Sequence, residues 1–178
     1  MIVSHVGITA ADDYLERRAA HREAHLARIT ELRRQGFVIG GGPSPDGKTA
    51  DLVYRSPQAG DLTRLIEEDP YWTGGVWKAW QPHDFSQFLE PWEMVPLVLD
   101  GSRKVTIVEG EAPDVEMASF ALIEARGGGR MAFGGFFPGG ATWAMMRSTE
   151  PDTVLAELAE TGFWKPGSLT ARPLLHVL

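Results

Sequence analysis

Residues 12–35 read DDYLERRAAHREAHLARITELRRQ, and Gly36 follows them. At 100° per residue, one broad stripe of this stretch holds its apolar side chains, which are Leu15, Leu26, Ile29 and Leu32. The pattern predicts one long helix that ends at the glycine. Arg22 and His25 fall in the same stripe. Because an unpaired buried polar group costs about 1 to 3 kcal/mol, we expect this helix face to border a partner carboxylate or a solvated cleft.

Asp69 is the carboxylate that we expect to pair with His25. It follows a second helical pattern at residues 61–68, whose apolar positions are Leu62, Leu65 and Ile66. Pro70 comes next and biases Asp69 away from helical geometry. The sequence therefore offers one base and one acid, distant along the chain, as a candidate pair.

The first 85 residues predict a ferredoxin-like unit. We expect strands at residues 2–8, 37–39, 51–55 and 76–81 and helices at residues 12–35 and 57–68. The turn residues Ser44-Pro45-Asp46-Gly47 join the second and third strands as a hairpin. The order is βαββαβ, in which two helices cover one face of a sheet.

The pattern starts again at Arg103. We expect strands at residues 105–108, 131–137, 142–147 and 174–178 and helices at residues 113–125 and 151–160. A shift of 92 positions superimposes Arg55-Ser56 on Arg147-Ser148, Tyr71-Trp72 on Phe163-Trp164, and Gly75 on Gly167. The chain is therefore interpreted as a tandem repeat. No histidine occurs between residues 103 and 175, so the second copy, residues 103–178, is a degenerate repeat without the ionisable pair.

Residues 86–102 lie between the repeats and show neither helical nor strand periodicity. We interpret them as a linker that packs against the protein. Phe88, Trp92 and Leu99 would be poor choices for a free tether.

The ordered motifs of residues 1–85 resemble the YCII-related family. The resemblance rests on Arg22-x-x-His25-Leu26, Gly36, Gly42-Pro43, Asp69-Pro70-Tyr71, Gly75 and Pro82-x-x-Phe85. It implies the dimeric α+β barrel group, in which two ferredoxin-like sheets pair face to face. The implied fold is α+β, with two tandem βαββαβ units that pair within one chain as such a barrel. A His and Asp pair has been proposed as the active site of this family, and both residues are present.

The chemistry that we expect is acid–base. A carboxylate on one imidazole nitrogen fixes the tautomer and leaves the other nitrogen of His25 as a base, and the ordinary histidine pKa of about 6.5 suits proton transfer near neutrality. Arg22, one turn earlier, has a fork that binds a carboxylate or phenolate, or else forms a salt bridge to Glu68 or Asp69. The alternative for the pair is a structural role, in which the carboxylate merely satisfies the hydrogen bonding of a core histidine.

Aromatic residues near Asp69 offer flat walls for a ligand, with core packing as the alternative: Tyr71, Trp72, Trp77 and Trp80. We take Tyr71 as a substrate-binding candidate.

A metal site is not expected. His21 and His25 have the i, i+4 spacing of helical metal ligands, but Glu23 does not directly follow the first histidine as H-E-x-x-H requires. Of the other histidines, we expect His5 to be structural, His83 to face solvent and His176 to lie in the last strand. The glycines at 40–42 run into a proline instead of opening a helix, so no phosphate-binding loop is predicted.

Composition excludes several classes of function. The chain has 178 residues, a net charge of −7 and no cysteine, which excludes disulfides and thiolate chemistry. Basic residues alternate with acidic ones, so nucleic-acid binding is not expected. No apolar run approaches the roughly 20 residues that span a bilayer, and no leader segment is evident. We therefore expect a cytoplasmic protein without a membrane partner.

The leading hypothesis is a small-molecule enzyme of the proton-transfer type, an isomerase or lyase without a cofactor. The barrel group includes muconolactone isomerases and ring-dehalogenating lyases, so the resemblance implies an enolisable ring or lactone as substrate. Two alternatives stay open: a non-catalytic ligand-binding or scaffold protein, and a cofactor-free monooxygenase acting on a quinol-like substrate. A homodimer of the whole chain also stays open.

Overall fold

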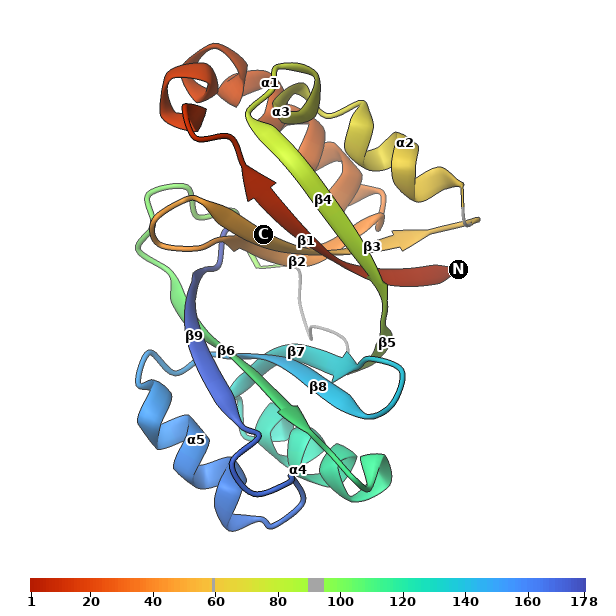
Figure 1. Cartoon of the computed structure of the whole chain (residues 1–178), viewed down its shortest axis with the longest axis vertical. Coiled ribbons are helices and arrows are strands. Elements are labelled where there is room, and N and C mark those ends of the chain that lie inside the picture. The colour runs from red at the N-terminus through yellow and green to blue at the C-terminus, as the bar shows by residue number, and fades with distance from the viewer. Residues whose placement is uncertain (59, 90–94) are drawn as a thin grey trace. The chain divides into compact units, whose positions relative to one another are not determined.

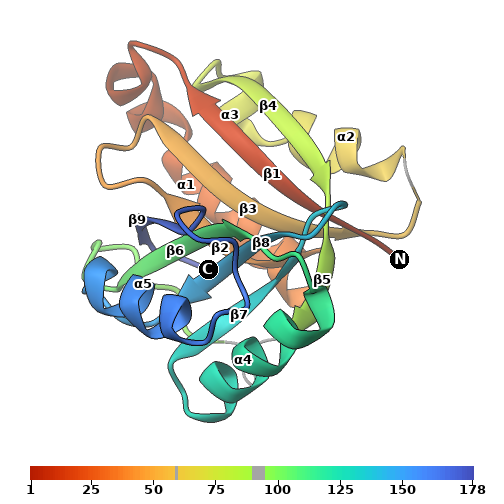
Figure 2. The same ribbon diagram turned by 60° about the horizontal axis from the view of Figure 1, so that its bottom comes forward.

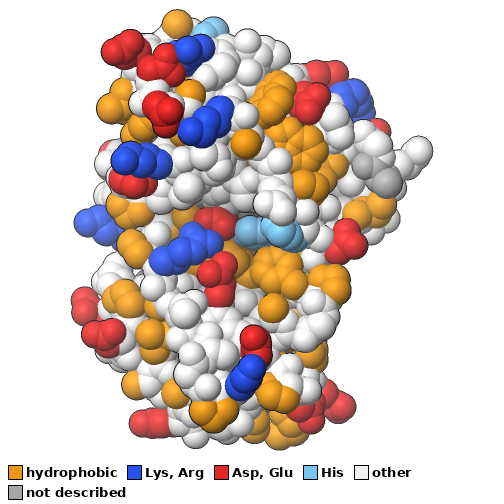
Figure 3. Space-filling model, viewed as in Figure 1, with side chains coloured by type: hydrophobic (Ala, Val, Ile, Leu, Met, Phe, Trp, Pro, Cys, Tyr) orange, Lys and Arg blue, Asp and Glu red, His pale blue; other side chains and the backbone are white. Residues whose placement is uncertain are grey.

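The computed structural model describes residues 1–58, 60–89 and 95–178. The chain divides into two compact units, the first made of Met1–Asp84 with His176–Leu178 and the second of Phe85–Leu175. Within the described residues, no helix is long and apolar enough to cross a membrane. Acidic and basic side chains are interspersed on the face seen in Figure 3, without a basic stripe.

The first unit is a ferredoxin-like βαββαβ fold. Its elements are β1 (Ile2–Ala10), α1 (Tyr14–Arg34), β2 (Val38–Pro43), β3 (Thr49–Ser56), α2 (Asp61–Glu67), α3 (Pro70–Thr73) and β4 (Trp77–Asp84). The strands form one antiparallel sheet in the order β2-β3-β1-β4. All three helices lie over the same face of this sheet (Figure 1). The expected order of strands and helices is confirmed.

Helix α1 packs through the second half of its apolar stripe. Ile29 and Leu32 are buried, whereas Leu15 is 65% exposed, so its expected place on the inward face was wrong. The first turn is held instead by Tyr14, whose hydroxyl donates a hydrogen bond to the Asp46 carbonyl oxygen at 2.7 Å. Gly36 ends the helix with a φ of +79°, a left-handed conformation that glycine adopts without strain.

The segment after α2 forms an element that the sequence did not predict. Asp69 has an extended backbone and caps the short helix α3, since its side chain accepts a hydrogen bond from the Tyr71 backbone N–H. Pro70 occupies the first helical position, where its missing N–H costs nothing. The Asp-Pro pair thus starts a new turn of helix and does not merely end the previous one.

The second unit repeats this topology. Its elements are β5 (Ser86–Leu89), β6 (Lys104–Glu111), α4 (Val115–Gly127), β7 (Met131–Phe136), β8 (Ala141–Met146), α5 (Pro151–Glu160) and β9 (Thr170–Leu175). The sheet order is β5-β7-β8-β6-β9, so the last four strands reproduce the order of the first unit. Figure 2 shows α4 and α5 with this sheet. Residues 176–178, expected in the closing strand, belong to the first unit, and Val177 and Leu178 donate backbone hydrogen bonds to Gly41.

The stretch expected to be a linker begins with a strand. In β5, Ser86 lies opposite Phe136 and Gln87 opposite Gly135, so the chain extends the sheet at the edge of β7. A strand of four residues is too short for alternation to reveal it. Leu99 is 44% exposed and does not pack as expected; Trp92 lies outside the described residues.

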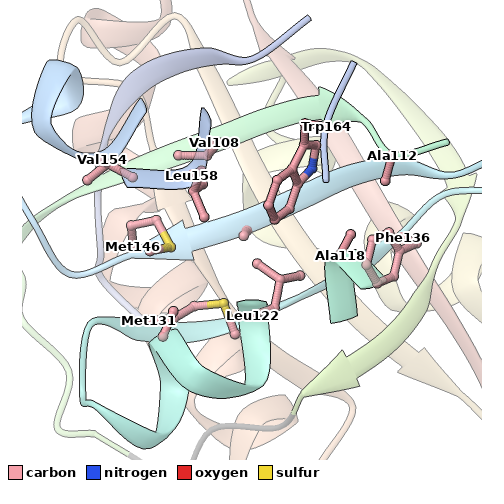
Figure 4. Packing of buried hydrophobic residues seen from close by; sticks show 12 residues of the cluster. Val108, Ala112, Ala118, Leu122, Met131, Phe136, Met146, Val154, Leu158 and Trp164 are labelled. Carbon is pink, nitrogen blue, oxygen red and sulfur yellow. The ribbon is translucent and has the colours of Figure 1, made fainter. Parts of the chain in front are cut away.

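The core of the second unit is apolar between its sheet and α4 and α5 (Figure 4). Leu122 and Met131 are fully buried in it. Trp164, the counterpart of Trp72 in the repeat, is buried there and donates a hydrogen bond to the Thr142 hydroxyl at 2.9 Å. This tryptophan serves packing.

Candidate active site

His25 and Asp69 meet between α1 and the start of α3. The imidazole Nδ1 lies 2.8 Å from Asp69 Oδ1. The Asp69 side chain is 1% exposed and the His25 side chain 13%. Two residues 44 positions apart in the chain are thus in direct contact, with the carboxylate sealed and the imidazole at the margin of solvent.

Asp69 is held by two donors at one oxygen. Its Oδ1 accepts from His25 Nδ1 and from the Tyr71 backbone N–H, each at 2.8 Å. The backbone bond belongs to the cap of α3, so the fold itself fixes the orientation of the carboxylate. A carboxylate so placed favours the imidazole tautomer with the proton on Nδ1.

The second imidazole nitrogen is available for chemistry. His25 Nε2 makes no hydrogen bond to any described residue. Nor is it among the fully buried unpaired atoms of the described chain, so it keeps contact with solvent. With the proton on Nδ1, Nε2 carries the lone pair of a base.

Aromatic rings surround the imidazole on two sides. The Tyr71 ring stacks on it with centroids 3.8 Å apart and planes at 9°, and Trp77 presents its edge at 5.4 Å and 80°. Tyr71 and Trp77 are both buried. The two rings fix the plane of the imidazole, and the Tyr71 face is positioned to stabilise an imidazolium.

Tyr71 and a second tyrosine have raised pKa values. Burial raises the pKa of the Tyr71 hydroxyl, against the opposing effects of the positive charges of Arg18 and Arg22. Burial also raises the pKa of Tyr54, and the negative charge of Asp69 adds to the shift. Tyr54 therefore lies near Asp69, and its buried hydroxyl has no hydrogen-bond partner among the described residues. Both phenols stay neutral at physiological pH.

Arg22 has no carboxylate partner among the described residues. Glu68, which the sequence offered as one, lies 3.2 Å from Arg28 instead. Arg22 is half-buried and close enough to lower the Tyr71 pKa. Sequence analysis missed Arg18 and Tyr54, because only the fold shows that they lie near Tyr71 and Asp69; the i, i+4, i+7 spacing of Arg18, Arg22 and His25 was the available signal.

His21 makes a contact outside the pair. A Cβ added at Gly74 would overlap the His21 ring, which therefore packs on the loop after α3. In the part of the chain that the structure describes, no group of three or more His, Cys, Asp or Glu residues is placed to hold a metal ion.

A second His and Asp pair was not foreseen. His5 Nε2 lies 2.8 Å from Asp51 Oδ1, and both residues are buried. His5 is opposite Val53, two positions from Asp51, so the pair shares one face of the sheet. Tyr54 follows Val53 in β3, so its side chain points to the opposite face, which the helices cover. The two pairs therefore lie on opposite faces of the first sheet, and His5 is the more buried histidine.

Comparison with known proteins places the fold. No protein-family model and no curated protein matches the chain. A proposed monooxygenase of Lactobacillus acidophilus matches with a TM-score of 0.64 and 13% identity, over 99% of this chain and 94% of that one. A heme-binding protein of Thermus thermophilus matches with a TM-score of 0.54 and 12% identity, over 98% and 91%.

A third match covers half of the chain. The 5-chloro-2-hydroxyhydroquinone dehydrochlorinase of Burkholderia phenoliruptrix, solved with 2,5-dihydroxybenzoquinone, aligns with 48% of this chain and 94% of its own, at 18% identity and a TM-score of 0.43. At these identities, likeness speaks for fold alone. The chain is a ferredoxin-like α+β protein with two βαββαβ units.

Proposed function

We propose that the first unit is a small-molecule enzyme in which His25 is the general base and Asp69 orients it. The observation that carries the proposal is the 2.8 Å contact between His25 Nδ1 and Asp69 Oδ1, which leaves Nε2 unpaired and in contact with solvent. The reaction class is proton transfer, in an isomerase or lyase acting on an enolisable ring or lactone. The substrate class comes from the resemblance of residues 1–85 to the YCII-related family.

The proposed first step is removal of a proton next to a carbonyl group. The Nε2 lone pair takes the proton, and the electrons of the C–H bond move to the carbonyl oxygen, which gives an enolate and an imidazolium. Asp69 stabilises the imidazolium through Nδ1, and the stacked Tyr71 ring adds a cation–π contribution. General base catalysis of this kind contributes roughly 10²- to 10⁴-fold.

The enolate has two fates that the same residues support. In an isomerase, Nε2–H returns the proton to another carbon of the conjugated system. In a lyase, the electrons return from oxygen and expel a leaving group such as chloride from the neighbouring carbon. Arg22 is the proposed partner of the enolate oxygen, a role worth several kcal/mol when the donor is preorganised.

Proton exchange tests the proposal directly. A panel of lactones and chlorinated quinols is incubated with the protein in D2O, and NMR follows exchange of carbon-bound protons and product formation. We expect His25→Gln to lose at least about 100-fold of any activity, with His83→Gln, a change at an exposed histidine of the same unit, close to wild type. Unchanged turnover in His25→Gln would remove His25 from the mechanism.

A structural role is the second candidate, because Asp69 also caps α3. On that account, His25→Gln lowers the melting temperature and leaves ligand affinity unchanged. The monooxygenase alternative is separated in the same panel by an oxygen electrode, since it requires oxygen consumption that depends on substrate. The proposed monooxygenase of Lactobacillus acidophilus shares the fold, which is why the electrode belongs in the experiment.

A further inference from the structure

Helix α1 holds six arginines, of which Arg33 is buried and the other five fall into two groups. Three of them have carboxylate partners: Arg17 with Asp13 at 2.7 Å, Arg28 with Glu68 at 3.2 Å and Arg34 with Glu31 at 2.6 Å. Arg18 and Arg22 have none among the described residues, although both are half-buried. Two partly desolvated cations without a counter-charge are costly unless an anion joins them.

Arg18 and Arg22 lie near the Tyr71 side chain. The positive charges of both arginines oppose the rise in the pKa of the Tyr71 hydroxyl that burial causes. The His25 ring stacks on the ring of the same tyrosine, with the two centroids 3.8 Å apart. In α1 the three residues follow one another at i, i+4 and i+7, which places them on one helix face. The unpaired cations and the open imidazole thus share one aromatic platform.

The chemistry of this arrangement favours an oxyanion. A guanidinium offers planar, paired N–H donors that match a carboxylate or a phosphate, and a neutral phenol adds an O–H donor. The enolate oxygen of the proposed reaction needs a single donor group. Two arginines exceed that need, which indicates a second, permanent negative charge in the ligand.

We propose that Arg18, Arg22 and the Tyr71 hydroxyl form an anion-binding subsite, and that the small molecule bound beside His25 carries a carboxylate. That this small molecule is a substrate rests on the proposed function, whereas the binding of an anion does not. Phosphate monoesters share the recognition chemistry, and the experiment separates them from carboxylates.

Binding is measured by isothermal titration with benzoate, with benzamide as its uncharged counterpart and with phenyl phosphate. We expect benzoate to bind about 10- to 100-fold more tightly than benzamide and to lose a similar factor in Arg18→Met and Arg22→Met. Arg17→Met is the matched control, because Arg17 is the neighbour of Arg18 and is already paired with Asp13; its affinity should stay within about twofold of wild type. Arg18→Lys should recover part of the affinity, since it keeps the charge and loses the fork.

The outcomes distinguish this proposal from the proposed function. If benzoate binds to His25→Gln as to wild type while no substrate of the panel exchanges protons, the subsite stands and the enzymatic proposal fails. If proton transfer depends on His25 but benzoate binds no better than benzamide, the subsite is refuted. Equal loss in Arg17→Met, or tighter binding of phenyl phosphate than of benzoate, would overturn the carboxylate assignment.

Discussion

Asp69→Asn separates the structural from the chemical role of the buried carboxylate. Asparagine has nearly the same size and keeps one acceptor oxygen, so it can still cap α3. It removes the negative charge and adds an N–H donor that competes for His25 Nδ1. With the amide oxygen in the Oδ1 position, both hydrogen bonds are kept and only the charge that stabilises the imidazolium is lost. With the N–H donor toward the ring, the imidazole must carry its proton on Nε2, and the base and the cap of α3 are lost together.

The magnitude follows from the two hydrogen bonds at Asp69 Oδ1, each 2.8 Å long. Hydrogen bonds to a charged group contribute about 1.5–3 kcal/mol, against about 0.5–1.5 for neutral ones. Loss of charge assistance in both therefore costs about 2–3 kcal/mol in the free energy of unfolding. At about 2–4 °C per kcal/mol for a chain of this size, the melting temperature should fall by about 4–12 °C. Activity should fall by more than about tenfold, because the imidazolium loses its counter-charge, and by up to about 10⁴-fold where the amide also reverses the tautomer.

Asp51→Asn is the matched control, because Asp51 is also buried and also lies 2.8 Å from a histidine. Both variants are measured by thermal unfolding and by the proton-exchange assay at about pH 7.5, above the ordinary histidine pKa. We expect both to lose stability and only Asp69→Asn to lose turnover beyond the loss of folded protein. Turnover of Asp69→Asn within tenfold of wild type, or an equal loss in Asp51→Asn, would refute the reasoning.

Two further predictions concern stability. Gly41→Ala should lower the free energy of unfolding by about 3–5 kcal/mol, because φ is +137° there and a Cβ would overlap the Asp51 carbonyl oxygen. In the control Gly7→Ala, the added Cβ meets nothing within 4 Å, and chemical denaturation should show a change of about 0.5 kcal/mol or less. Equal losses in the two variants would contradict this. Burial raises the Tyr54 pKa above the unfolded value of about 10, so the folded state holds the phenol proton more tightly: its contribution to stability is complete below about pH 10 and is lost as the pH rises through the folded pKa. Melting temperatures from about pH 9 to about pH 11.5 should fall less steeply in Tyr54→Phe, and an unchanged slope would argue against the shift.

Local pattern was enough to predict the elements that frame the site. Helix α1 was evident because its apolar period runs through Ile29 and Leu32 to a glycine stop. The pairing of His25 with Asp69 could be anticipated because a polar residue on an apolar face needs a partner. The face-to-face pairing of the two sheets, implied by the family resemblance, stays a prediction.

What the sequence did not show depends on tertiary packing. Leu15 is exposed because Tyr14 anchors the first turn, and no periodicity distinguishes two neighbouring apolar side chains. In the sequence, nothing distinguishes Arg18 from the other arginines of a charged helix, and only the fold places it near Tyr71. The contact of His5 with Asp51 depends on the register of two paired strands, which side-chain spacing along one strand does not reveal.

The second unit bears on whether His25 and Asp69 are merely structural. It forms the same βαββαβ strand order with no histidine between residues 103 and 175. Under the shift of 92 positions, Thr161 takes the place of Asp69, and its hydroxyl donates a hydrogen bond to the Leu158 carbonyl oxygen. The cluster of buried side chains that the structure describes between this sheet and its helices is apolar, and replacing a buried ion pair with apolar side chains is often neutral or stabilising. A carboxylate kept at 1% exposure beside an imidazole with an open nitrogen is thus not required by the topology, which favours a chemical role for it in the first unit.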